Sequence, residues 1–123
     1  MSKGNFLKID WNNKSGNAKL TAVNFKDGEY HIIYIPSLNL SSYGETEEEA
    51  YLIMKDIVIK DFLENLLEAS EHDAKEELRK LGWNQNNLLK KQFTSKAYIN
   101  KEGILKAFEL EADTQIEEAT LEL

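Results

Sequence analysis

Residues 19–36 read KLTAVNFKDGEYHIIYIP, and this stretch decides the fold. An Asp-Gly pair tolerates the positive φ angles of a two-residue type I′ turn, so Asp27 and Gly28 predict a tight hairpin with Lys26 opposite Glu29. This register places apolar side chains on both faces of the ribbon. Because an exposed hairpin face normally alternates to polar residues, we expect this ribbon to be covered twice, by a helix on one face and by a second element on the other.

The predicted register also states which side chains share a face, since alternate residues of a strand point to the same side. A shift by one residue would move every side chain to the opposite face. The pairs expected on one face are Phe25/Tyr30, Val23/Ile32 and Thr21/Tyr34, and those on the other are Asn24/His31, Ala22/Ile33 and Leu20/Ile35.

A helix is expected after the hairpin. Pro36 has no amide hydrogen and ends the second strand, and a short third strand with alternating apolar and polar residues leads to Gly44. Thr46, followed three residues later by Glu49, matches a capping box, in which the threonine hydroxyl accepts a hydrogen bond from the Glu49 N–H. The acidic first turn also suits the positive end of the helix dipole. The sequence therefore predicts a long helix from about Glu47 to Glu68.

The apolar residues of this helix do not form one straight stripe. At about 100° per residue, the apolar residues of the first half of the helix lie on one face, and those of the second half lie on nearly the opposite face. One sheet cannot cover both faces, so we expect the second half of the helix to pack on another body, either the C-terminal segment or a second copy of the chain. The apolar residues of the first half are Ala50, Ile53, Met54, Ile57 and Val58, and those of the second half are Ile59, Phe62, Leu63 and Leu66.

The strand Tyr30 to Pro36, followed by Gly44-Glu45-Thr46-Glu47-Glu48-Glu49-Ala50, resembles the N-terminal domain of HicB-type antitoxins. That family has a tyrosine-bearing strand, a proline-led loop and a Gly-Asp-Thr-x-Glu-Glu-Ala string that opens a helix; here Glu45 replaces the usual aspartate. The resemblance covers residues 19–67. It implies a partial RNase H-like α+β fold without nuclease activity, which binds and masks a small basic RNA-cleaving toxin.

Composition fits one small domain spanning residues 1–123. Apolar residues make up 41% of the chain and charged residues 30%, which is typical of soluble globular proteins. The chain has no cysteine and no apolar run of the ~20 residues that span a membrane, so we expect a cytoplasmic protein without disulfides. The isolated histidines His31 and His72 predict no metal site, and no cofactor is expected.

The rest of the chain gives weaker signals. Leu7, Ile9 and Trp11 alternate with polar residues and predict an additional strand within residues 1–11. Ser70 and Gly82 are the expected N-cap and C′ residues of a second, short helix from about Glu71 to Leu81. The C-terminal extension, residues 83–123, begins with a segment that fits either a polar strand or a helix. It is poor in basic residues, so nucleic-acid binding is not expected.

The C-terminal end is strongly acidic. Residues 1–106 contain 16 acidic and 15 basic residues, so nearly all of the net charge of −7 comes from the residues after Lys106. Alternating apolar residues there predict one or two edge strands with a carboxylate face. Such a face either prevents edge-to-edge aggregation or steers a cationic partner toward the protein.

Two functions follow, and neither is enzymatic, because no nucleophile, phosphate loop or carboxylate pair stands out. The first is an antitoxin-like module that binds a small basic protein. The second is a structural module that buries the rotated helix stripe in a homodimer. The partner contacts expected for the first function are Tyr30, Tyr34, Leu38, Tyr43, Glu109, Glu111, Glu117 and Glu118.

Overall fold

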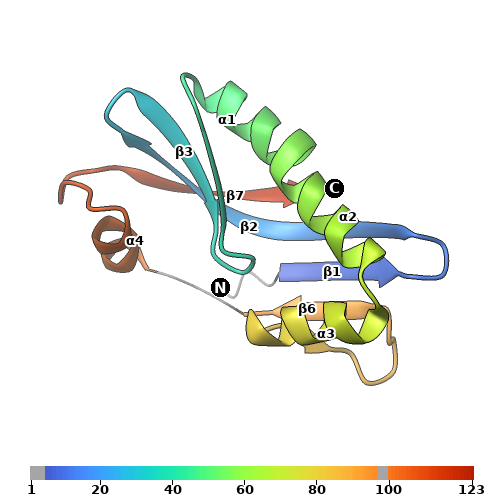
Figure 1. Cartoon of the computed structure of the whole chain (residues 1–123). Coiled ribbons are helices and arrows are strands. Elements are labelled where there is room, and N and C mark those ends of the chain that lie inside the picture. Colours follow the sequence, from blue (N-terminus) through green and yellow to red (C-terminus); the bar gives the residue numbers. More distant parts are fainter. Residues whose placement is uncertain (1–4, 97–99) are drawn as a thin grey trace.

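The long strand β2 (Ser15–Asp27) is the centre of the α+β fold in the computed structural model, which describes residues 5–96 and 100–123 (Figure 1). The described residues form one antiparallel sheet of seven strands and three helices. The other strands are β1 (Asn5–Asp10), β3 (Tyr30–Ile35), β4 (Leu40–Gly44), β5 (Asn84–Gln85), β6 (Gln92–Ser95) and β7 (Ile116–Glu122). The helices are the continuous helix α1 (Glu47–Ile53), η1 (Met54–Ile59) and α2 (Lys60–Glu68), then α3 (Glu71–Lys80) and α4 (Lys101–Ala107).

Both edges of β2 are used. β1 pairs with residues 15–19 of β2, and β3 pairs with residues 23–27. β7 pairs with residues 19–25, so its range overlaps both of the others. A residue cannot pair with two strands on the same edge, so β7 occupies one edge, and β1 and β3 follow one another along the other. The sheet therefore divides at Thr21, with β1, β6 and β5 on one branch and β3 and β4 on the other.

The hairpin between β2 and β3 turns one residue later than predicted. Asp27 pairs with Tyr30, so Gly28 and Glu29 form the two-residue turn. Gly28 has φ +62° in the first turn position, as a type II′ turn requires. The predicted register was therefore wrong by two residues, but a shift of two keeps every side chain on its predicted face.

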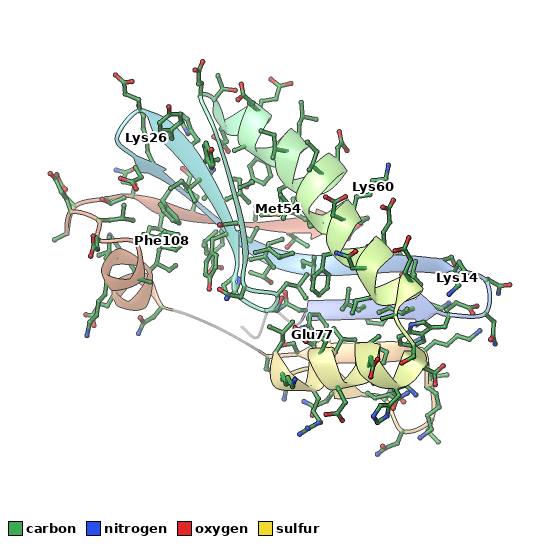
Figure 2. All side chains as sticks on the ribbon, viewed as in Figure 1. Lys14, Lys26, Met54, Lys60, Glu77 and Phe108 are labelled. Carbon is green, nitrogen blue, oxygen red and sulfur yellow. The ribbon has the colours of Figure 1, made fainter. Side chains whose placement is uncertain are left out.

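The expected double coating of the ribbon is found. On one face the buried residues Leu20 and Ile33 belong to the main core, together with Met54 of the long helix. On the other face Val23 and Phe25 pack with Ile104 of α4 and form a second, smaller core. Phe108, which follows α4, packs against this core (Figure 2). The element that supplies the second coat, α4 with the loop after it, was not predicted as a helix.

The long helix has the predicted bounds but a different geometry. Its middle segment, η1, is a π-helix with the wider i→i+5 turn. Met54 and Ile59 are five residues apart, and in an α-helix they would diverge by about 140°. The π-helical turn instead returns Ile59 to the face that carries Ala50 and Met54, and all three lie in the main core with Leu66. The second half therefore shares one core with the first. Of the two bodies expected to cover it, the C-terminal segment is the one that contributes, through Leu121 and Leu123.

The short helix and the C-terminal region complete the sheet. The Ser70 hydroxyl accepts a hydrogen bond from Asp73 N, and Gly82 with φ +95° follows α3, so this helix begins and ends as predicted.

Residues 83–95 form the strand alternative, with β6 paired to β1. One C-terminal strand, β7, forms within the described residues. The segment expected to be strand or helix runs from Trp83 to Tyr98, and its residues 97 and 98 lie outside the described residues. None of the helices in the described ranges is both long and apolar enough to cross a membrane.

Candidate functional site

A groove of about 440 Å³ runs along the outer side of β4, the last strand of its branch. One wall is the edge strand itself with Tyr30 of β3, and the opposite wall is the long helix with Ile53 and Val58. Glu45 and Glu49 also line it. The groove is thus apolar along the helix and carboxylate-lined where the helix begins.

Three local features position the two walls of the groove. The Ser42 hydroxyl donates to the Ala50 carbonyl oxygen at 2.8 Å, and both residues are buried. Thr46 caps the helix by accepting from Glu49 N at 3.1 Å. A Cβ atom at Gly44 would lie 2.7 Å from Ala50 N, so this close approach of strand and helix requires glycine.

Two exposed aromatic side chains stand at the groove. Tyr30 and Tyr43 make an edge-to-face contact with ring centroids 5.6 Å apart, because Tyr43 pairs with Ile32 and lies diagonal to Tyr30 on the same face. Tyr30 is 47% exposed and Tyr43 is 66% exposed. Each ring therefore presents apolar surface to solvent in a fixed relative orientation.

The groove lies within an acidic region. No lysine or arginine occurs between Lys26 and Lys55, and none occurs after Lys106. Pairing of His31 with Gly44 brings the helix start to the hairpin end, and pairing of Phe25 with Ile116 brings β7 to the same end (Figure 1). We call the result the acidic pole; its exposed carboxylates are Asp27, Glu29, Glu45, Glu47, Glu48, Glu49, Glu117 and Glu118.

The negative charge of the acidic pole affects the pKa of Tyr51 on the long helix. Burial raises the pKa of Tyr51, and the negative charges of Glu47 and Glu117 raise it further. These two glutamates come from the helix and from β7, so the same side chain is close to both acidic stretches. The tertiary structure has therefore concentrated negative charge that the sequence distributes over two separate segments.

The predicted contact residues separate into groups. Tyr30 and Tyr43 lie together at the groove. Tyr34 is half-buried: its hydroxyl donates to Asn39 Oδ1 at 3.1 Å, and its ring packs edge-on against Phe108. Leu38 is 2% exposed in the main core, so it is unavailable as a surface contact, and this prediction was wrong. Of the predicted acidic contacts, Glu117 and Glu118 lie on β7, whereas Glu109 and Glu111 are exposed in the loop between α4 and β7.

The sequence reasoning missed the helical wall of the groove and its acidic lining. Ile53 and Val58 had been assigned to the sheet-facing stripe. Glu45 and Glu49 had been interpreted as helix-start residues alone. The run of acids without a base from Asp27 to Glu49 was the available signal, but it needed the strand pairing to become a surface.

The displaced carboxyl pKa values belong to surface ion pairs away from the groove. Lys91 donates to Asp10 and holds the pKa of this carboxyl at about 2, with a further hydrogen bond from Asn13. Arg79 lowers the pKa of Glu76 on α3 in the same way. Within residues 5–96 and 100–123, no cluster of three or more histidine, aspartate or glutamate side chains could hold a metal ion. The arrangement at the groove is suited to recognition of a cationic surface.

Comparisons of this chain with protein-family models, with curated proteins and with solved structures find no match.

Proposed function

We propose that this chain is a non-enzymatic protein-binding module, and that its partner is a small basic protein of the kind masked by the HicB-type antitoxins that residues 19–67 resemble. The observation that carries the proposal is the exposed Tyr30/Tyr43 pair set within the acidic pole. Tyrosine is among the residues that most often dominate binding energy at protein interfaces. An acidic surround would accelerate association with a cationic partner and select against acidic ones.

The charge distribution supports a basic partner. Residues 27–54 and 107–123 contain no lysine or arginine but hold twelve of the 22 acidic residues. A toxin that cleaves RNA needs a basic surface to bind phosphates. Such a surface would be complementary to the acidic pole, and a protein bound there would compete with RNA for it.

The main argument for a homodimer does not hold in the folded chain. It was based on a second helix stripe without cover, but η1 returns Ile59 to the main core, where Leu66 also lies. In addition, two copies meeting at the acidic pole would place like charges together, which is unfavourable. We therefore favour a partner of opposite charge.

The test is co-expression of the tagged full chain with the product of an adjacent short reading frame that encodes a basic protein. We expect the two proteins to co-elute and RNA cleavage by the partner to be suppressed. Tyr43→Ala should weaken binding by at least about tenfold, the loss of one interface hot spot. The matched control is Leu88→Ala, which removes an apolar side chain that is 91% exposed in the loop between β5 and β6. Absence of binding, or equal affinities for the two variants, would refute the proposal.

A further inference from the structure

The hydrogen bonds of β2 show which backbone groups of β4 point away from the sheet. Ala18 and Leu123 exchange both backbone hydrogen bonds, Ala18 N to Leu123 O at 3.2 Å and Leu123 N to Ala18 O at 2.9 Å. Backbone groups alternate between the two edges of an antiparallel strand. Even-numbered residues of β2 therefore bond toward β7, and odd-numbered ones toward β1 and β3. Thr21 N, which donates to Asn5 Oδ1 at 2.7 Å, agrees with this alternation.

The same alternation can be followed across β3 to β4. Phe25 pairs with Ile32, so even-numbered residues of β3 bond to β2 and odd-numbered residues bond to β4. Ile33 pairs with Ser42, and the register continues without a bulge from His31/Gly44 to Ile35/Leu40. The backbone N–H and C=O groups of Ser41 and Tyr43 consequently point away from the sheet, and both residues are exposed.

These outward backbone groups border the groove. Ser41 and Tyr43 line it on the strand side, and Ile53 and Val58 line it on the helix side. A groove between an edge strand and a helix is a site where an extended peptide can add a strand, with backbone hydrogen bonds to the edge and side-chain contacts to the helix. With β4 five residues long, the paired part of such a peptide would be of similar length.

We propose that the groove binds an extended, lysine- or arginine-bearing segment of a partner protein, which pairs with β4 as an added strand. This inference rests on the proposed function and specifies how the basic partner is held. The charge of the groove selects the occupant, since Glu45 and Glu49 line it and Glu47 and Glu48 belong to the same first turn of the helix. Alternate side chains of the segment would face the apolar helix wall and the carboxylates.

The probe is the synthetic peptide acetyl-Lys-Val-Lys-Val-Lys-amide, added to the isotope-labelled full chain. Amide hydrogen exchange by NMR should slow at Ser41 and Tyr43 on binding, since their N–H groups would become hydrogen-bonded. A peptide with glutamate in place of lysine should not bind. Two further lysine peptides, one N-methylated at the valines and one at the lysines, test the backbone contact. Since only one of these two sets of N–H groups can face β4, one of the two peptides should bind at least about tenfold more weakly than the unmethylated peptide.

A protein variant tests the same backbone contact from the other side. Ser41→Pro removes the outward N–H and leaves the bonds between β3 and β4 intact, which is where proline is tolerated in a sheet. Ser41→Ala is the matched control and keeps the N–H. We expect about tenfold weaker peptide binding for Ser41→Pro and unchanged binding for Ser41→Ala. If Ser41→Pro does not fold, the N-methylated peptides carry the test alone.

The outcomes separate this inference from the proposed function. A basic partner that binds without slowing exchange at Ser41 and Tyr43 would overturn the added strand and leave the function standing. Slowed exchange with the lysine peptide, but no basic protein partner, would support the added strand and refute the function. Slowed exchange caused by self-association, detected by light scattering without any peptide, would show that a second copy occupies β4 and would overturn the inference.

Discussion

Asn5 Oδ1 accepts a hydrogen bond from Thr21 N at 2.7 Å, at the point on β2 where pairing passes from β1 to β3. The Ser37 hydroxyl donates to the same oxygen at 3.1 Å, and both Asn5 and Ser37 are buried. Trp83 Nε1 donates to the Ser37 carbonyl oxygen at 2.8 Å. The divided sheet thus has a polar link at its fork, which satisfies a backbone N–H that no strand reaches.

Replacing Asn5 should destabilise the protein at this fork. Asn5→Ala leaves the partly buried Thr21 N–H without its acceptor, and we expect the free energy of unfolding to fall by about 2 kcal/mol. Urea denaturation followed by circular dichroism measures the change. The control Asn12→Ala alters an exposed asparagine and should shift stability by less than about 0.5 kcal/mol. Equal effects of the two substitutions would contradict a structural role for the link.

The π-helical segment predicts an unusual response to deletions. Deleting Lys55, an exposed residue in η1, would shorten the spacing of Met54 and Ile59 to four and allow an ordinary α-helix with the same buried face. Deleting the exposed Glu64 in α2 would rotate Leu66 by about 100° out of the core. We expect the second deletion to cost at least about 2 kcal/mol more than the first in urea unfolding. The reverse order would show that η1 does not align the two halves.

Acid should weaken the contact between Asp10 and Lys91. The pKa of Asp10 is lowered from 3.8 to about 2, mainly by the hydrogen bond from Lys91. The folded state therefore binds its proton less readily than the unfolded state, so this contribution to stability is complete above about pH 4 and is lost as the pH falls to about 2. Urea midpoints measured across this range should fall less steeply for Asp10→Asn than for the unchanged protein. Parallel curves would contradict the assignment.

The second coat of the ribbon depends on Ile104. This residue is 1% exposed and packs against Val23 and Phe25. Ile104→Ala should reduce the free energy of unfolding by about 3 kcal/mol and accelerate amide exchange throughout α4. The comparison is Leu88→Ala, which removes an exposed apolar side chain and should leave both quantities unchanged. Rapid exchange of α4 in the unchanged protein would show that the coat is not stably packed.

Local patterns were enough to predict most individual elements and the two faces of the hairpin. The Thr46 and Ser70 caps mark where two helices begin, because a cap is formed by residues three apart in the sequence. The face assignment of Val23 and Phe25 survived an error in the turn because strand side chains alternate with a period of two. The candidate site was only partly visible, since Tyr30 and Tyr43 were expected as contacts but the helix wall was not.

By itself, the sequence determined the hairpin, the bounds of the long helix and the imbalance of charge, all of which depend on neighbouring residues. The tertiary structure alone decided that η1 rotates Ile59 onto the core face, that β1 and β3 share one edge of β2, and that two acidic stretches form one pole. Those outcomes depend on helix geometry and on pairing between residues far apart in the chain, such as Phe25 with Ile116. Because local propensity carries no information about such pairings, the groove beside β4 could be recognised only once the chain was folded.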